Sequence, residues 1–237
     1  MNILAIDTSD RVLSVALAAE TGVLCTELDA GMRHSELLMK SVDSLCAIAG
    51  IKPAQITHLA CMKGPGSFTG LRIGFAAAKG MALALNIPLT AVPTLDCLAY
   101  PFSAWPALVL PAMDAKKGCF FAALYRGGQR LTDYLDASPQ TLAQAITDTR
   151  LSPGERILLT GCGSELLYPR LADLYPAAFI SIDPDPKRGR ARELLKIARN
   201  ATMPADDGNS GPVYLRKSDA ELNAGKEQVS VEDGGFE

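Results

Sequence analysis

Apolar and polar positions divide the first half of the chain into strands and helices in a regular order. Alternating apolar runs with β-branched residues, separated by polar turns, predict extended strands. Leu38, Val42 and Leu45 recur at helical spacing, which predicts an amphipathic helix around them. The expected order is strands Asn2–Asp7, Val12–Ala19 and Val23–Ala30, helix Arg33–Ala49, strand Ile56–Met62, helix Thr69–Leu85, strand Leu89–Val92 and a short helix capped by Thr94.

The second half repeats this order of elements. An apolar strand again ends in an acid, Asp114, and Gly127-Gly128 is typical of a tight hairpin turn. Helices and strands then alternate as before. The expected order is strand Ala107–Asp114, hairpin Cys119–Arg126 with Gln129–Asp136, helix Pro139–Thr149, strand Arg156–Thr160, helix Ser164–Leu174, strand Phe179–Ile182 and helix Arg190–Asn200.

In both halves the pattern therefore predicts three strands followed by alternating helices and strands (βββαβαβα), although the two halves show no sequence identity that supports a duplication. Three antiparallel strands followed by crossover helices form a mixed sheet covered by helices. Two such halves facing each other across a cleft resemble the actin/Hsp70/sugar-kinase superfamily of ATPases. We therefore expect an α/β protein with a two-lobed actin-like ATPase fold. The predicted divisions are residues 1–106, residues 107–207 and a polar, partly disordered tail at 208–237.

Composition adds a general class to this picture. The 237 residues are 48% hydrophobic and 21% charged, which is typical of a globular protein that needs no disulfide or metal. A net charge of −3 argues against bulk electrostatic binding of nucleic acid. The six cysteines form no C-x-x-C pair, which is typical of thiols in a reducing cytosol. No signal peptide or membrane span is predicted, so we expect a cytoplasmic protein with no membrane partner.

One glycine-rich segment, Gly64-Pro65-Gly66-Ser67-Phe68-Thr69-Gly70-Leu71-Arg72-Ile73-Gly74, joins a predicted strand to a predicted helix. It is neither a Walker A loop nor a G-x-G-x-x-G loop. Ser67 or Thr69 can cap the helix, whose free N–H groups then form an anion site. A tight strand-to-helix turn explains the same glycines without any ligand. Both interpretations stay open at this point.

Small residues recur along the helix that follows. Gly70, Gly74, Ala78 and Ala82 form one row, and Ala76, Gly80 and Ala84 form a second. Small residues at this spacing let another helix approach closely. The partner is either the helix Arg33–Ala49 or a helix of another chain, and composition favours neither.

Three segments together resemble the YeaZ/TsaB family, and the resemblance runs from Asn2 to about residue 221. They are Leu4-Ala5-Ile6-Asp7-Thr8-Ser9, the Gly64–Gly74 segment and Tyr214-Leu215-Arg216-Lys217. The resemblance implies a non-catalytic actin-like subunit of the bacterial machinery that installs threonylcarbamoyl on the adenosine beside the anticodon in tRNA. Its implied partners are the catalytic paralogue TsaD and the small ATPase TsaE, with tRNA bound only through the assembled complex and a homodimer when the chain is alone.

The resemblance also implies a docking face on the two predicted helices Arg33–Ala49 and Thr69–Leu85. A bulky charged residue at Ala77 or Gly74 is expected to abolish pairing and leave the fold intact. The implied interface residues are His34, Leu37, Leu38, Ser41, Leu45, Thr69, Arg72, Ile73, Ala76, Ala77 and Gly80.

Some positions that hold a metal or a nucleotide in the catalytic relatives carry other residues in this chain. The paralogue carries His-x-x-x-His on its first helix, whereas His34 here is followed at that spacing by Leu38, so we expect no metal site. Ser9 stands where actin-like kinases have the glycine of Asp-x-Gly. We expect no tightly bound cofactor, with ATP or ADP and Mg²⁺ at most at the partner interface. The residues expected next to such a nucleotide are Asp7, Thr8, Ser9, Gly64, Gly66 and Ser67.

Two loops of the second half are compatible with nucleotide binding. Asp114-Ala115-Lys116-Lys117-Gly118 matches the phosphate turn of the first half, and Thr160-Gly161-Cys162-Gly163-Ser164 resembles the adenosine loop of the superfamily. The alternative function is therefore a stand-alone actin-like kinase or ATPase that uses Asp7 or Asp114. A peptidase has little support, because the chain lacks His-Glu-x-x-His and Gly-x-Ser-x-Gly.

One basic stretch lies near the end of the second half. Its cations either form a solvated helix face or help an assembled complex to hold tRNA phosphates. Aromatic residues do not interleave with them, so base stacking is not expected there. The stretch comprises Lys187, Arg188, Arg190, Arg192, Lys196 and Arg199.

Overall fold

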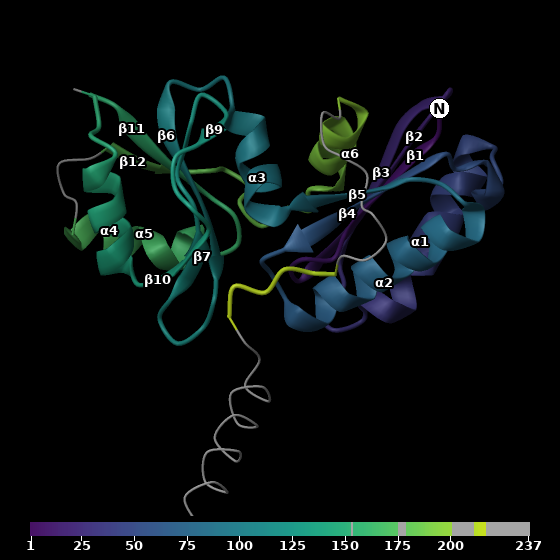
Figure 1. Cartoon of the computed structure of the whole chain (residues 1–237), viewed down its shortest axis with the longest axis horizontal. Coiled ribbons are helices and arrows are strands. Elements are labelled where there is room, and N and C mark those ends of the chain that lie inside the picture. The colour runs from purple at the N-terminus through teal and green to yellow at the C-terminus, as the bar shows by residue number, and fades with distance from the viewer. Residues whose placement is uncertain (153, 175–178, 201–210, 217–237) are drawn as a thin grey trace, which may run out of the picture.

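The computed structural model describes residues 1–152, 154–174, 179–200 and 211–216, which form two lobes side by side (Figure 1). Within these ranges the first sheet has five strands in the order β3-β2-β1-β4-β5. The pairs β1–β2 and β2–β3 are antiparallel, whereas β1–β4 and β4–β5 are parallel. The strands are β1 (Ile3–Asp7), β2 (Val12–Ala19), β3 (Gly22–Asp29), β4 (His58–Gly64) and β5 (Leu89–Pro93).

The second sheet repeats this topology. Its described strands follow the order β10-β7-β6-β11-β12, and the short strands β8 and β9 extend the antiparallel side. β6 pairs antiparallel with β7 and parallel with β11, as β1 does with β2 and β4. The strands are β6 (Ala107–Asp114), β7 (Phe120–Ala122), β8 (Tyr125–Arg126), β9 (Gln129–Arg130), β10 (Leu135–Ala137), β11 (Arg156–Thr160) and β12 (Phe179–Ile182).

The predicted order of elements is confirmed, with one local difference. Each arm of the predicted second hairpin is broken into two short strands, β7 with β8 and β9 with β10. The break occurs at Leu124, whose hydrogen bonds lie outside the regular strand pairing. Its carbonyl accepts from Leu131 N–H, and its N–H donates to the Thr132 hydroxyl. The turn at Gly127-Gly128 joins β8 to β9 as expected, with both glycines at positive φ.

Helices cover both faces of the first sheet. On one face, α1 (His34–Ala49) and α2 (Phe68–Leu85) pack on Leu4, Ile6 and other strand residues of one apolar cluster. On the other face, Ile3 and Ala5 contact a second cluster that contains Leu194 and Leu195 of α6 (Ala191–Arg199). Alternate residues of β1 therefore serve two separate cores, which is why the strand is apolar throughout.

The last helix of each half packs on the other lobe. Helix α3 (Thr94–Ala99) buries Leu95 and Leu98 against Val109 and Leu158 of the second sheet, and the short helix η2 (Tyr100–Phe102) continues this contact. Helix α6 crosses in the opposite direction and packs on the first sheet (Figure 1). Helices α4 (Pro139–Asp148) and α5 (Ser164–Leu174) cover the remaining face of the second sheet.

The division into residues 1–106 and 107–207 stays a prediction. Two helices cross it in space: α6 packs on the first sheet, and α3 contributes Leu95 and Leu98 to a cluster with the second sheet and Cys97 to the cluster under α6. The reason is that each sheet has two apolar faces, and its own helices cover only one of them. The two lobes therefore depend on each other for a complete core.

The structure describes one part of the expected tail. Residues 211–216, which we call the strap, contact both lobes: Val213 N–H donates to the Lys63 carbonyl, and Arg216 binds Asp136 in the second lobe. The remainder of the expected tail, residues 208–210 and 217–237, lies outside the described residues.

Among the described helices, α2 is long and apolar enough to cross a membrane by length and composition. It nevertheless packs on β4 and buries Leu71, Phe75 and Ala78 in the cores of the first lobe. A helix of a folded core meets the same criterion of length and composition. All six cysteines lie in the described ranges and are free thiols.

Candidate functional site

A cleft opens between the lobes where the carboxyl ends of β1 and β6 face each other. Open α/β sheets bind ligands at such edges. The largest described cavity there has a volume of about 560 Å³. The loop before α1 and the start of α2 form one wall, and the turn after β6 forms the other. Its lining includes Asp10, Arg11, His34, Gly66, Ser67, Phe68, Asp114, Lys116, Phe121 and Cys162.

Asp7, the acid at the end of β1, is fully engaged by the chain itself. Its Oδ1 accepts hydrogen bonds from Ser9 N at 2.9 Å and Ser9 Oγ at 2.6 Å, and its Oδ2 accepts one from Arg190 N at 2.9 Å. Burial raises the pKa of Asp7, and the hydrogen bonds only partly oppose this shift. The chain itself thus uses three of the roughly four acceptor positions of this carboxylate.

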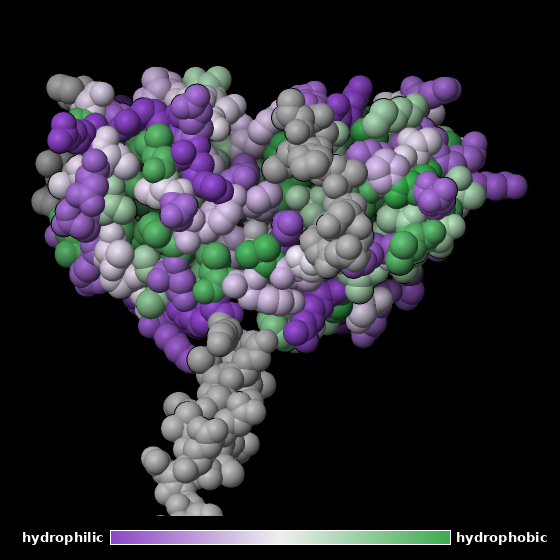
Figure 2. Space-filling model, in the orientation of Figure 1, coloured by the Kyte–Doolittle hydropathy of each residue, from purple (hydrophilic) through white to green (hydrophobic). Residues whose placement is uncertain are grey.

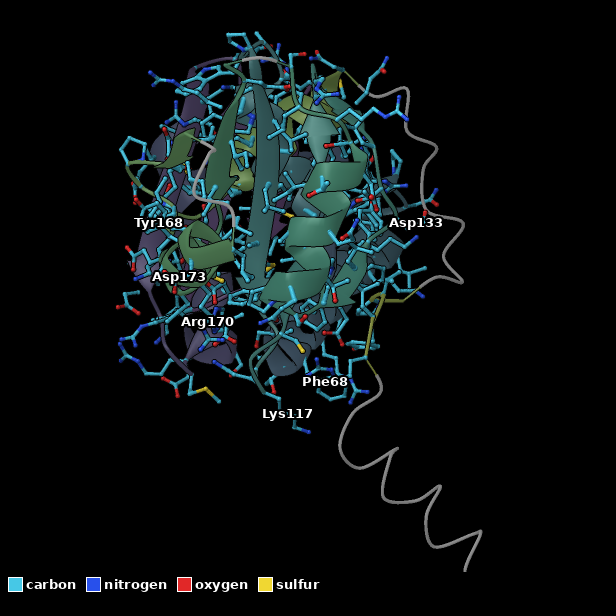
Figure 3. The ribbon with its side chains drawn as sticks, turned by 90° about the vertical axis from the view of Figure 1, so that its left-hand side faces the viewer. Phe68, Lys117, Asp133, Tyr168, Arg170 and Asp173 are labelled. Atoms are coloured by element: carbon cyan, nitrogen blue, oxygen red, sulfur yellow. The ribbon has the colours of Figure 1, made fainter. Side chains whose placement is uncertain are left out.

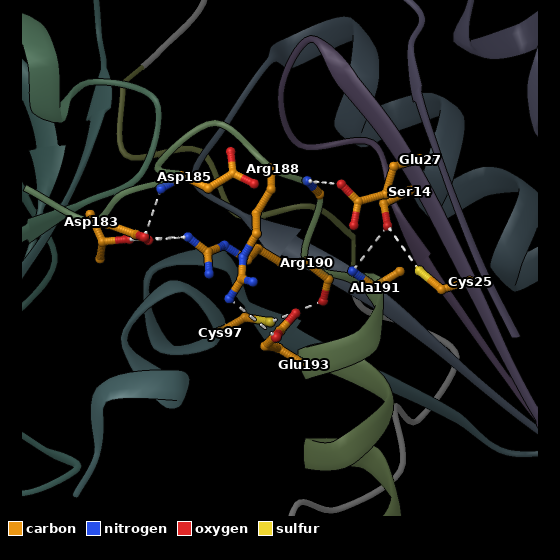
Figure 4. A network of polar contacts seen from close by, with 12 residues as sticks. Ser14, Cys25, Glu27, Cys97, Asp183, Asp185, Arg188, Arg190, Ala191 and Glu193 are labelled. Carbon is orange, nitrogen blue, oxygen red and sulfur yellow. Dashed lines mark hydrogen bonds and ion pairs between the residues drawn. The ribbon is translucent and has the colours of Figure 1, made fainter. Parts of the chain in front are cut away.

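A buried arginine beside Asp7 joins the two lobes (Figure 4). Arg190 is 1% exposed, and its Nη2 donates to Asp183 Oδ2 at 2.8 Å and to Thr160 Oγ1 at 3.1 Å, both in the second lobe. Its backbone N–H binds Asp7 in the first lobe, and its carbonyl accepts from Cys97 Sγ. Burial alone would raise the pKa of Asp183, but the hydrogen bonds from Arg190 and its other partners hold this pKa below the ordinary value.

The residues around Arg190 lie tightly against the first sheet. Gly189 N–H donates to Glu27 Oε2, and Ala191 N–H donates to Ser14 Oγ. A Cβ at Gly189 would lie 2.2 Å from Ser14 Cβ, so only glycine fits here without a shift. Sequence reasoning placed Arg190 in a basic stretch and missed this junction. The signal available was a glycine immediately before an arginine at a predicted helix start.

The glycine-rich loop packs closely on the turn that follows β1. Ser67 N–H donates to the Ser9 carbonyl at 2.7 Å, and Thr8 Oγ1 donates to the Gly70 carbonyl at 2.8 Å. A Cβ at Gly66 would lie 2.5 Å from the Ser9 carbonyl oxygen. Ser67 is the N-cap of α2 and accepts from Gly70 N–H, as predicted. The loop therefore closes on the Thr8–Ser9 turn, which supports the interpretation as a tight turn.

Gly64 has an additional reason to be glycine. Its φ is 106°, and a Cβ would lie 2.4 Å from the carbonyl oxygen of Val213 in the strap. Of the residues expected beside a nucleotide, Asp7, Thr8, Ser9, Gly66 and Ser67 thus contact one another or Arg190, and Gly64 contacts the strap. The structure brings these residues together and binds them to one another or to neighbouring segments, while Gly66 and Ser67 also line the 560 Å³ cavity.

The two loops of the second lobe that are candidates for nucleotide binding, residues 114–118 and 160–164, also make close contacts within the chain. Asp114 accepts from both the backbone N–H and the Nζ of Lys116, at 2.8 and 2.7 Å. A Cβ at Gly161 would lie 2.6 Å from the Ala112 carbonyl oxygen. Burial raises the pKa of the Cys162 thiol to about 12, so this thiol stays protonated and poorly nucleophilic at neutral pH.

The histidines do not form a metal centre. His34 lies at the start of α1 and is buried, and its Nε2 has no hydrogen-bond partner among the described atoms. His58 lies on β4 and contacts Thr90 Oγ1 at 2.8 Å. In the described ranges, no three His, Cys, Asp or Glu side chains are grouped in a way that could hold a metal ion.

The residues expected on the docking face fall into three groups by exposure. Four of them, His34, Leu38, Ser41 and Leu45, are buried in this structure, and His34 also lines the cleft. The reason is that the apolar stripe of α1 faces its own sheet. The exposed positions are Thr69, Arg72, Ala76 and Gly80, and the half-buried ones are Leu37, Ile73 and Ala77.

The two rows of small residues on α2 have opposite surroundings. Gly70, Gly74, Ala78 and Ala82 are buried, and a Cβ at Gly74 would lie 2.1 Å from Thr8 Oγ1. Gly70 and Gly74 therefore pack on the turn after β1, whereas Ala78 and Ala82 lie in the apolar cluster that also contains the buried residues of α1. Gly80 in the outer row has nothing within 4 Å of its Cβ position, and Ala76 and Ala84 are exposed.

This difference predicts opposite effects for one substitution at two positions. Gly74→Ala should destabilise the protein by about 1–3 kcal/mol, because the added methyl group overlaps Thr8. Gly80→Ala should stabilise it by up to about 1 kcal/mol, because alanine has the higher helix propensity and space is open. Urea unfolding of both variants measures the two free energies. Equal changes would contradict this assignment of the rows.

Several large apolar side chains remain exposed on α1 and α2. Ile48 is 67% exposed and Leu83 is 72% exposed, and Met39 and Phe68 are also exposed. Figure 2 shows apolar residues in green over α1 and α2, at the right of the view. Helical spacing puts Arg72, Ala76, Gly80 and Leu83 on one side of α2. We call the exposed surface of the two helices that includes these four residues the α1–α2 face.

The basic stretch is partly neutralised. Lys187 pairs with Glu165, and Arg188 lies 3.5 Å from Glu193. Arg190 is buried, whereas Lys187 is exposed beside Glu165 and Arg192, Lys196 and Arg199 are exposed on α6.

The chain is similar in sequence to known proteins. The family model described as "TsaD: tRNA N6-adenosine threonylcarbamoyltransferase" matches residues 16–161. The Bacillus subtilis tRNA threonylcarbamoyladenosine biosynthesis protein TsaB is 38% identical over 222 residues, which cover 93% of this chain and 96% of the relative. The Escherichia coli protein of the same name is 36% identical over 130 residues, covering 53% of this chain and 55% of that protein.

Solved structures add the fold. A Pseudomonas aeruginosa protein described as similar to peptidase YEAZ superposes with a TM-score of 0.72 at 26% identity, covering 91% of this chain and 99% of that chain. A structure of YeaZ from Pseudomonas aeruginosa superposes with a TM-score of 0.64 at 26% identity, covering 85% of this chain and 93% of that chain. Together with the duplicated sheet topology, these matches confirm the two-lobed actin-like fold. This chain belongs to the YeaZ/TsaB family.

Proposed function

We propose that this chain takes part in tRNA threonylcarbamoyladenosine biosynthesis as a non-catalytic subunit that pairs with a TsaD-type catalytic paralogue. The names of its relatives support the pathway. The single observation that supports pairing is the α1–α2 face, where Leu83 lies exposed on the same side of α2 as the exposed small residues Ala76 and Gly80. Small residues between apolar ones allow a partner helix to approach closely.

The cleft supports a subunit without chemistry of its own. A nucleotide phosphate in an actin-like cleft needs free backbone N–H groups after β1 and an acid for Mg²⁺. Here Asp7 accepts three hydrogen bonds from the chain, and Ser67 N–H is bound to the Ser9 carbonyl. We therefore derive no catalytic step through a phosphate group held by these residues. ATP or ADP with Mg²⁺ at the partner interface stays in the proposal as a group held mainly by residues of the partner.

The same face accounts for the other proposed associations. When the partner is absent, two copies of the α1–α2 face can cover each other, which gives a homodimer. The small ATPase TsaE and the tRNA then join the complex formed with the catalytic paralogue. In this proposal the isolated chain neither modifies tRNA nor turns over ATP.

Native mass spectrometry of the chain mixed with a TsaD-type protein tests the proposal. The expected result is a stable one-to-one pair, together with tRNA modification only by mixtures that contain the paralogue. If instead the isolated chain hydrolyses ATP and Asp7→Asn abolishes the turnover, the alternative of a stand-alone kinase or ATPase replaces this proposal.

A further inference from the structure

A second cavity lies where the strap crosses between the lobes, and it combines aromatic rings with cations. It has a volume of about 320 Å³. Phe68 comes from the start of α2, Phe121 from β7 and Tyr214 from the strap. Lys116, Lys117 and Arg216 lie on the same walls. We call this space the aromatic cavity.

Each ring of the aromatic cavity is held in place by contacts. The Phe68 and Tyr214 rings have centroids 4.9 Å apart, and the Arg72 guanidinium lies 3.8 Å from the Phe68 centroid. Arg72 Nε also donates to the Tyr214 hydroxyl at 3.1 Å. The Phe121 ring centroid lies 5.9 Å from the Arg216 guanidinium. Phe68 and Tyr214 are each 37% exposed and Phe121 is half-buried, so part of each of the three residues is open to solvent.

The cations lie at the same end of the molecule as Phe68. Figure 3 shows Phe68 and Lys117 at the lower end of the view. Lys116 pairs with Asp114, and Arg216 binds Asp136 and the Ala115 carbonyl. Because these carboxylates neutralise two of the cations, ring stacking should contribute more to binding than charge does.

Ring surfaces beside ammonium groups are the chemistry that recognises unpaired nucleotides. The exposed cations of α6 lack aromatic residues among them, so they can contact phosphates but cannot stack bases. From this contrast we infer that the aromatic cavity binds one unpaired nucleotide of the RNA substrate, stacking its base on Phe121 or Tyr214 with a phosphate near Lys116 and Lys117. This inference rests on the proposed function in tRNA modification.

Substitutions at Phe121 test stacking separately from apolar packing. Phe121→Leu keeps an apolar side chain in the half-buried position and removes the ring, whereas Phe121→Tyr keeps the ring. The reconstituted pair with a TsaD-type partner is titrated with a fluorescent tRNA anticodon stem-loop. We expect Phe121→Leu to weaken RNA binding by about tenfold or more and Phe121→Tyr to bind within about twofold of the unaltered chain.

A charge variant provides the second measurement. The double variant Lys116→Gln with Lys117→Gln should weaken binding by less than Phe121→Leu does. Lys52→Gln, at an exposed position outside the cavity, is the matched control and should change nothing. Equal RNA affinity for the leucine and tyrosine variants would overturn the inference, because an apolar peptide contact does not need a ring.

Two further outcomes separate this inference from the proposed function. If the pair forms normally and no cavity variant changes RNA affinity, the inference fails and the pairing proposal stands. Adenosine 5′-monophosphate alone serves as a second probe. Binding of this mononucleotide that depends on Phe121, without any effect on the stem-loop, would show a site for free nucleotides and would also overturn the inference.

Discussion

Ala76→Glu is expected to abolish pairing with a TsaD-type partner and to leave the fold intact. Ala76 is exposed in the outer row of α2, so glutamate is solvated in the free protein. In a helix pair the same carboxylate would be buried without a partner, which costs about 3 kcal/mol or more, or about a hundredfold in affinity. Isothermal titration calorimetry measures the loss, and unfolding midpoints check that the fold is retained.

The control for this variant is Ala104→Glu, which adds the same charge at an exposed position outside the α1–α2 face. It should pair like the unaltered chain. Ala76→Glu should also convert any homodimer of the isolated chain to a monomer, because the proposed surface is shared. Normal pairing by Ala76→Glu would rule out this face as the interface. Gly74, expected from sequence to give the same effect, is unsuitable because its Cβ position overlaps Thr8.

Arg190→Met is expected to produce the largest loss of stability. The substitution leaves the Asp183 carboxylate, 6% exposed, without its buried cation. Breaking a buried ion pair on one side typically costs about 3–5 kcal/mol. Because Arg190 connects Asp183 and Thr160 of one lobe to a segment packed on the other, we also expect a looser junction between the lobes. Urea unfolding measures the free energy, and hydrogen exchange at β1 and β11 reports the junction.

Two companion variants test the cause of that loss. Lys187→Ala removes an exposed ion pair of the same segment and should cost at most about 1 kcal/mol. Combining Arg190→Met with Asp183→Asn should recover part of the stability, since no unpaired buried charge then remains. A double variant that is as unstable as the sum of the two single variants would mean that Arg190 acts through packing alone.

Local signals were sufficient for the order of elements. Periodicity of apolar residues placed the helices of both halves within a residue or two, and Ser67 was correctly predicted as a candidate cap of α2. The family resemblance at Gly64–Gly74 was also readable, since the motif is contiguous. These features depend on neighbours within a few positions, so they leave a pattern in the sequence.

The site could be predicted only in part. Asp7, Thr8, Ser9, Gly66 and Ser67 do lie together, but sequence could not show that they bind each other rather than a ligand. His34 and Leu38 were expected at a partner surface and are buried instead. Helical spacing shows that residues share one face, and it does not show whether that face meets the chain's own sheet or another protein.

The sequence alone therefore determined the duplicated layout, the actin-like class and the family of this protein, because each depends on local periodicity or a contiguous motif. Tertiary structure alone decided that α6 packs on the first sheet and α3 on both lobes, that Gly70 and Gly74 pack on Thr8, and that Arg190 joins the lobes beside Asp7. The physical reason is distance along the chain. Arg190 and Asp7 are 183 residues apart, and a contact of that range leaves no periodic signal in either segment.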